Sequence, residues 1–293
     1  MTTIAPPPPA PTTPPPPLSP GGRTAFRLAL IAAAAVLVVG TLASLGAVAL
    51  GIAGFRVITD SKPLPVAMRS VFVDTGTVPV AVRIITDREA REPRADLRMV
   101  NSTRAGANPL VVNTDPAGAH VTINGESSAF LQWGRAGEIT LVLPPDVARK
   151  LTVTVKQDTG VVLAQADIDQ LIAHTDTGAV VLSGAARRVE IHNVDGEVLS
   201  SDPIRVTESF SATTETSDIK VDFADTAPRT VDVSSRDGDV LVALPAHGPY
   251  VVNANSVDAD AQVRVPQTTN REDAAAVVTA RSQTGDVIID DLR

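Results

Sequence analysis

The chain has 293 residues and a formal net charge of −8, with 23 prolines, 19 glycines and no cysteine. The lack of cysteine excludes a disulfide framework, a thiolate nucleophile and any cysteine-ligated metal site. Residues 190–293 carry 19 acidic and 8 basic side chains. This part of the chain repels phosphate backbones, so we expect no nucleic-acid partner.

The first segment, residues 1–22, is dominated by proline, with ten prolines among its first 20 residues. Such a segment cannot bury a core and lacks many backbone donors, so we predict a disordered tail that populates polyproline II. Two roles fit this composition. The tail is either a plain spacer or a ligand for an aromatic-lined groove.

Residues 24–55 are predicted to form one transmembrane helix, because no side chain from Leu28 to Phe55 is charged. A helix of this length spans about 42 Å, against a hydrocarbon core of roughly 30 Å. The alternatives are a signal peptide cleaved after residues 47–49 and a buried core helix, but a signal core is usually shorter. Flanking positive charges are nearly balanced. We predict a cytoplasmic N-terminus because long domains translocate largely regardless of charge, and the lipid bilayer is then the first expected partner.

Residues 56–66 are predicted to be a short stalk, and residues 67–293 an extracytoplasmic β-repeat domain. Valines alternate around Gly76 at its start. Residues 83–108 then break the alternation with six arginines interleaved with acidic side chains. We predict a solvated loop with internal ion pairs there, and a basic patch for anionic lipid is the alternative.

One strand-turn-strand template organises the rest of the chain and is clearest in Val231–Ala243, VDVSSRDGDVLVA. With Gly238 as position zero, the apolar residues at −7, −5, +2 and +4 are predicted to face inward, while Asp239 and Leu241 face outward. The template recurs at intervals of 18 to 26 residues, with position zero at Gly137, Gly160, Gly178, Gly196, Ser217, Ala259 and Gly285. A period near 20 indicates a solenoid. The predicted fold class is therefore an all-β, parallel β-solenoid-like or β-roll repeat domain, clearest over 130–293, after one transmembrane helix and without further helices.

Five segments of the form T-x-x-G-D-V-x-[IVL] carry a family resemblance: QDTGVVL (157–163), TDTGAVVL (175–182), NVDGEVL (193–199), SRDGDVLV (235–242) and SQTGDVII (282–289). From Leu151 onward the chain resembles bacterial β-strand-repeat, adhesin-like domains of unknown function. The resemblance implies a β-solenoid-like domain at the cell envelope, often tethered by an N-terminal membrane helix. Ser217 and Ala259 depart from the glycine of the motif, which suggests that their turns do not require a positive φ.

Acidic residues recur at position +1, directly after the turn residue: Glu197, Asp218, Asp239, Asp260 and Asp286. Stacked rungs about 4.8 Å apart would place them in one column. We interpret them as turn residues whose side chains accept from backbone N–H groups. The alternative is a weak calcium site, because carboxylate oxygens suit this ion, although the nonapeptide calcium repeat is absent.

Histidines at position −4 of adjacent units, His174 and His192, are expected to stack, and without a third ligand no zinc site is predicted. No nucleophile-elbow motif is present. We therefore expect no enzyme activity and no cofactor.

The sequence thus predicts a single-pass, membrane-anchored cell-envelope protein with an extracytoplasmic adhesin-like domain that binds or scaffolds. An envelope protein or a glycan is the expected partner. Two other interpretations stay open, namely an envelope-stress or signalling accessory protein and, less favoured, a polysaccharide-active enzyme.

Overall fold

The computed structural model describes residues 55–102, 108–116, 118–124 and 137–292. The predicted tail and the predicted transmembrane helix lie outside these residues, except for Phe55, which begins the first strand. Within the described ranges no helix has the length and apolar character needed to cross a membrane.

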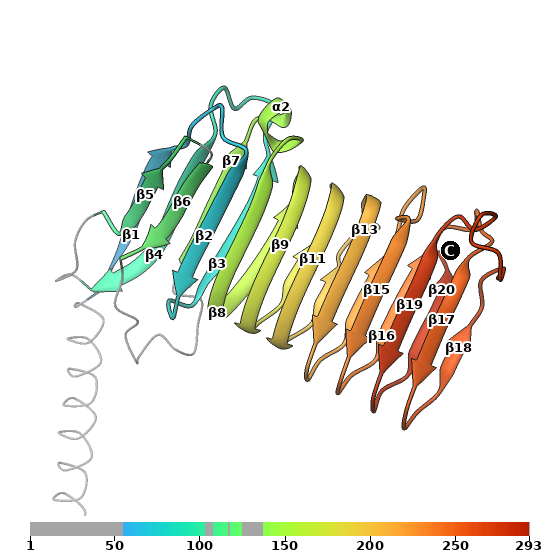
Figure 1. Ribbon diagram of the computed structural model, residues 1–293. Coiled ribbons are helices and arrows are strands. Elements are labelled where there is room, and N and C mark those ends of the chain that lie inside the picture. Colours follow the sequence, from blue (N-terminus) through green and yellow to red (C-terminus); the bar gives the residue numbers. More distant parts are fainter. Residues whose placement is uncertain (1–54, 103–107, 117, 125–136, 293) are drawn as a thin grey trace, which may run out of the picture. The chain divides into compact units, whose positions relative to one another are not determined.

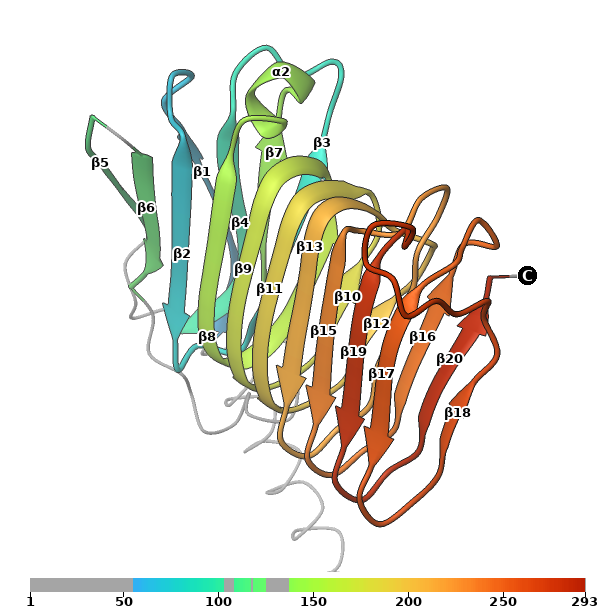
Figure 2. The same ribbon diagram turned by 45° about the vertical axis from the view of Figure 1, so that its right-hand side comes forward.

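The described strands form two sheets that face each other, and the repeat units are stacked as rungs along them (Figures 1 and 2). A typical rung has one strand in the first sheet, sheet B, then a turn at position zero, then one strand in the second sheet, sheet A. In spatial order sheet B contains β5 (Leu110–Thr114), β6 (Gly118–Ile123), β2 (Ser70–Gly76), the first half of β8 (Thr152–Gln165), β9 (Asp167–Thr177), β11 (Ala185–Asp195), β13 (Arg205–Thr214), β15 (Thr230–Ser235), β19 (Val277–Ser282) and β17 (Val251–Ser256).

Sheet A follows the same rungs on the opposite side of the core. Its strands are, in spatial order, β1 (Phe55–Pro63), β4 (Arg94–Ser102), β7 (Gly137–Leu143), β3 (Val80–Thr86), the second half of β8, β10 (Val180–Leu182), β12 (Val198–Ser200), β14 (Ile219–Asp222), β16 (Val240–Leu244), β20 (Val287–Asp291) and β18 (Ala261–Val263).

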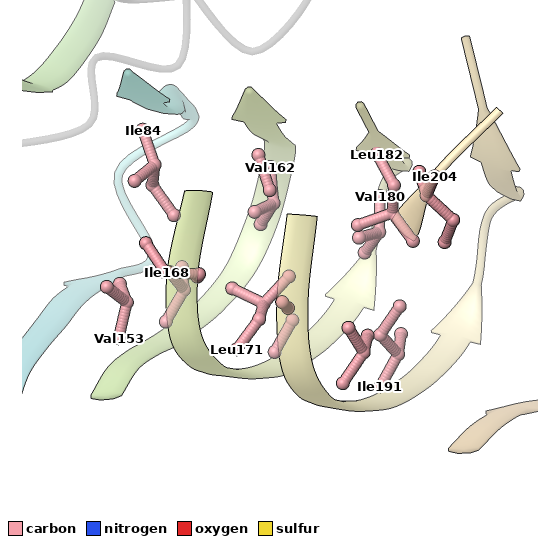
Figure 3. Close-up of a cluster of buried hydrophobic side chains, with 14 of the residues drawn as sticks. Ile84, Val153, Val162, Ile168, Leu171, Val180, Leu182, Ile191 and Ile204 are labelled. Atoms are coloured by element: carbon pink, nitrogen blue, oxygen red, sulfur yellow. The ribbon is translucent and has the colours of Figure 1, made fainter. Parts of the chain in front are cut away.

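The core lies between the sheets and consists of aliphatic columns that run from rung to rung. Val153, Leu171 and Ile191 reach in from sheet B, and Val162 and Val180 meet them from sheet A (Figure 3). Because strand side chains alternate, each column repeats the same template position in the next unit. The predicted parallel β-solenoid-like architecture is confirmed for the rungs from β8 to β20. In β16, for example, the predicted inward residues Val240 and Val242 are 0% and 1% exposed.

The spatial order of the rungs differs from the chain order at both ends. At the C-terminal end β15 pairs with β19, and β19 pairs with β17, so the last unit of the chain inserts before the one that precedes it. At the N-terminal end β8 pairs with β2, and β2 pairs with β6. The terminal rungs therefore do not stack in chain order.

The prediction that the apolar template positions face a buried core is wrong for the end rung, β17/β18. Val252, Ala254 and Val263 are only partly buried, and Ala261 is exposed. These residues match the template, but their rung has a neighbour on one side only. Phe130, also predicted to face inward, lies outside the described residues.

The N-terminal part differs most from the sequence-based expectation. Residues 94–102 form β4, which pairs antiparallel with both β1 and β7, so residues 83–108 are not simply a solvated loop. Its alternate residues Ala95, Leu97 and Met99 are buried, a period-2 pattern in which the charged Asp96 and Arg98 lie between them. Most of the expected stalk forms β1 and belongs to the same sheet.

Two further expectations for this region can be compared with the structure. One predicted internal ion pair is present, since Arg94 contacts Asp96 at 2.9 Å. A short helix, α2 (Pro145–Ala148), follows β7 where no helix was expected. Its proline in the first turn costs no hydrogen bond, because that N–H would have no partner inside a helix.

Candidate functional site

The acidic residues at position +1 lie on one edge of the stack and are joined by hydrogen bonds between rungs. The Asp239 N–H donates to Asp218 Oδ1 at 2.8 Å, and the Asp286 N–H donates to Asp239 Oδ1 at 2.8 Å. The Asp260 N–H continues the series, donating to Asp286 Oδ1 at 3.1 Å. The predicted capping role therefore holds for Asp218, Asp239 and Asp286, each of which caps the next rung in space.

From Thr177 onward, the neighbouring column at position −1 alternates between threonine and aspartate. Thr216 donates to Asp195 at 3.2 Å, and Thr284 donates to Asp237 at 2.7 Å. Thr284 comes last in the chain, yet it lies between Asp237 and Asp258 because β19/β20 inserts between the two preceding rungs. The exchanged order thus places a hydroxyl between carboxylates that would otherwise repel each other.

The five calcium candidates, Glu197, Asp218, Asp239, Asp260 and Asp286, are therefore brought together as a column, with Asp286 before Asp260. Among the described residues no three or more acidic or histidine side chains are grouped so that they could hold a metal ion. Calcium binding by this column stays a prediction, and the contacts described above assign Asp218, Asp239 and Asp286 to backbone capping.

A polar ladder at position −3 was not recognised in the sequence. Its members are at most 3% exposed: Gln157, Thr175, Asn193, Thr214, Ser235 and Ser282. The Thr175 hydroxyl donates to Asn193 Oδ1 at 2.8 Å, and the Ser282 hydroxyl donates to the Gly238 carbonyl at 2.8 Å. From Asn193 onward the ladder satisfies turn carbonyls inside the stack. The amide nitrogen and oxygen of Gln157 are buried without a hydrogen-bond partner among the described residues. Aligning the repeats by their turn residue would have revealed it.

The outward face of sheet A carries an apolar stripe at position +3. Strand register places Leu163 beside Val181, Val181 beside Leu199, and Leu241 beside Ile288. We call these five residues the outer stripe. They are half-buried, because each side chain is shielded by its neighbours in adjacent rungs but has no second layer above it among the described residues. Arg83 and Gln262 continue the column at its two ends, and Lys220 interrupts it between Leu199 and Leu241.

A groove of about 350 Å³ lies on this face where the outer stripe meets the acidic column. Leu199, Lys220 and Leu241 line it together with Glu197 and Asp218. Both carboxylate residues are exposed. The outer stripe and the acidic column therefore run side by side, one apolar and one anionic, over several rungs. This face is the candidate functional site.

The outward face of sheet B has a different character. The stacking of His174 on His192 is confirmed, with ring centroids 5.2 Å apart and an angle of 3° between the planes. The equivalent positions in the following rungs are Thr213, Ser234, Arg281 and Asn255. This column is polar throughout, in contrast to the outer stripe.

An ion-pair network lies at the start of the strands on the sheet B side. Arg187 contacts Asp169 at 2.8 Å, and both Arg187 and Arg188 contact Glu208. Hydrogen bonds from Arg188 and Arg187 lower the pKa of Glu208 to about 2. A carboxylate whose pKa falls on folding stabilises the folded state above its ordinary pKa, and this contribution is lost as the pH falls towards 2. The four side chains are at the surface, so we assign them a modest structural role.

No protein-family model matches the sequence, and no curated protein matches it either. Solved structures with a similar arrangement include a "putative cell adhesion protein" from Clostridium sporogenes, with 10% identity and a TM-score of 0.41, covering 81% of this chain and 100% of that one. A "putative adhesin" from Bacteroides fragilis has 13% identity and a TM-score of 0.40, covering 81% and 97%. Another from Parabacteroides distasonis has 8% identity and a TM-score of 0.39, covering 80% and 97%. Similarity at this level leaves the function to be argued from the chain's own residues.

Proposed function

We propose that this chain is a single-pass, membrane-anchored cell-envelope protein whose extracytoplasmic β-repeat domain binds another envelope molecule through the outward face of sheet A. The observation that carries the binding role is the outer stripe. Five aliphatic side chains in register occupy an outward face that a soluble stack would be expected to fill with polar residues.

The anchor is supported by the sequence. Residues 28–55 contain no charge and are long enough to span a bilayer. Only one such segment occurs, and the repeat domain follows it. Long domains translocate largely regardless of charge, so this arrangement favours a protein that presents its repeat domain on the outer side of the membrane.

The described surface does not favour catalysis. Carboxylates at the turn edge accept backbone hydrogen bonds, and the Asp169, Arg187 and Glu208 side chains are engaged with one another. A binding or scaffolding role needs only the face itself. We therefore propose a binding module and assign no catalytic residues.

Reporter fusions test the location of the domain. Alkaline phosphatase, which is active only outside the cytoplasm, is fused after Arg293 in a bacterial host, and a green fluorescent protein fusion at the same position is the reciprocal control. We expect phosphatase activity without fluorescence. A full-length phosphatase fusion that is inactive, paired with a fluorescent partner fusion, would disprove the extracytoplasmic assignment. Deleting residues 24–55 should remove the phosphatase activity.

A further inference from the structure

From the chemistry of the candidate site we infer that its partner is a protein segment that folds as a cationic amphipathic helix and lies along the outer stripe. This inference rests on the proposed binding role and adds the class of ligand. It follows from three properties of the face: its apolar chemistry, its charge and its spacing.

The apolar chemistry favours a protein segment over a glycan. Sugar rings are usually held by flat aromatic side chains together with polar groups, whereas the outer stripe consists of leucine, isoleucine and valine. Aliphatic side chains in a row are complementary to the apolar face of an amphipathic helix, which recurs every three to four residues.

The charge selects a cationic partner. Glu197, Asp218 and Asp239 border the outer stripe, and Asp286 and Asp260 extend the border to the end rung. Lys220 is the single basic side chain within the stripe column between Leu163 and Ile288. Anionic lipid surfaces and nucleic acids are repelled by such a border. A second copy of this chain would bring its own acidic column to the interface, so self-association through this face is also disfavoured.

The spacing fits a helix that crosses the strands. Rungs are about 4.8 Å apart, so the five steps from Leu163 to Ile288 span about 24 Å. A helix rises about 5.4 Å per turn, so about 16 residues cover this length and place one apolar side chain near almost every rung. Lysine or arginine on one flank of that helix would then face the acidic column.

Peptide binding to the full chain tests the inference. The chain is held in zwitterionic lipid nanodiscs, which accommodate residues 28–55, and empty nanodiscs serve as the blank. The probe is a fluorescent 16-residue helical peptide with leucine along one face, lysine along one flank and glutamine elsewhere. Two comparison peptides keep its length, one with the residues scrambled and one with every lysine replaced by glutamate. Fluorescence anisotropy measures the Kd of each.

We expect the lysine peptide to bind at least about tenfold more tightly than either comparison peptide, with an affinity that falls as salt is added. Leu199→Thr and Leu241→Thr should each raise its Kd about tenfold by removing apolar contact area. Ile172→Thr is the matched control, because Ile172 is a half-buried outward residue of sheet B, and it should leave the Kd unchanged. Glu197→Gln with Asp218→Asn should weaken binding and reduce its salt dependence.

Several results would overturn the inference. They are the absence of peptide binding, equal binding of the glutamate peptide, equal Kd values for the Leu199→Thr and Ile172→Thr proteins, or a dimer of the chain that Leu241→Thr dissociates. Melting temperatures of all variants are compared with that of the parent chain to show that they are folded. Because the peptide assay uses purified protein, its failure is distinguishable from failure of the reporter fusions, which test the location of the domain.

Discussion

Two rungs built on the same sequence template show how position in the stack determines what a repeat contributes. In the β15/β16 rung Val231, Val233 and Val240 are fully buried. In the β17/β18 rung the equivalent valine and alanine residues are partly buried or exposed, although they occupy the same template positions. The first rung has neighbours on both sides and the second on one side only. The apolar residues of a solenoid repeat are therefore buried only when rungs pack against the repeat on both sides.

The largest expected difference in stability between the two rungs comes from placing a charge at position +2. Val240→Asp buries a carboxylate without a partner and should lower the free energy of unfolding by several kcal/mol. Ala261→Asp makes the same change at the exposed equivalent position and should cost less than about 1 kcal/mol. Denaturant unfolding of residues 55–293 measures both, with the fragment starting at Phe55 because β1 pairs with β4. Equal losses would show that the β17/β18 rung is covered in solution.

A smaller effect is expected at position zero, where the turns of adjacent rungs approach closely. Gly178 has φ +144°, and a Cβ added to it would lie 1.6 Å from the carbonyl oxygen of Gly160. Gly178→Ala should therefore cost about 3 kcal/mol, because the backbone of one rung must move. Ala259 occupies the same position in the end rung and already carries a Cβ. Ala259→Gly should cost only about 0.5 to 1 kcal/mol, from the greater freedom of the unfolded chain.

Unfolding curves of the two turn variants are compared directly with that of the parent fragment. A Gly178→Ala protein as stable as the parent would mean that the turns are more widely spaced than the structure indicates. The prediction that the turns at Ser217 and Ala259 do not require a positive φ is confirmed. Among the described residues, Asp225 is the one non-glycine residue with a positive φ.

The sequence was sufficient to predict the repeat, because period-2 burial around a turn depends on local chemistry. The inward positions, the outward direction of Asp239 and Leu241, and the stacking of His174 on His192 all follow from template phase. The order of the strands at the two ends of the stack could not be predicted from template phase. Exchanging β17/β18 with β19/β20 leaves each strand's own pattern unchanged, so nothing within a single unit specifies which neighbour it has.

The candidate site was only half visible for a related reason. The acidic residues stood out because they share one position, while the outer stripe was hidden within ordinary strand composition. Leu163, Val181 and Leu199 became a continuous surface only when the register placed them side by side. The N-terminal antiparallel strands were missed because the alternation of Ala95, Leu97 and Met99 is typical of a strand but does not specify its partners, β1 and β7. Both errors concern pairing between distant segments, which a local pattern does not encode.

The smallest expected effect separates the two roles of the acidic column, capping and charge. Asp239 accepts the Asp286 N–H and lies beside Asp218. Asp239→Asn keeps an oxygen acceptor but removes one charge, so it should change the free energy of unfolding by less than about 1 kcal/mol, with relief of repulsion favouring a small gain. Asp239→Ala removes the acceptor and should cost about 1 kcal/mol, as the loss of a helix cap does.

Asp260 is the matched control, because it belongs to the end rung and β18 has no strand beyond it among the described residues. Asp260→Ala should therefore leave stability nearly unchanged. If Asp239→Ala and Asp260→Ala have equal effects, the hydrogen bonds between rungs do not contribute to stability. If Asp239→Asn is as destabilising as Asp239→Ala, the charge itself is required, and a bound cation then becomes the better explanation for the acidic column.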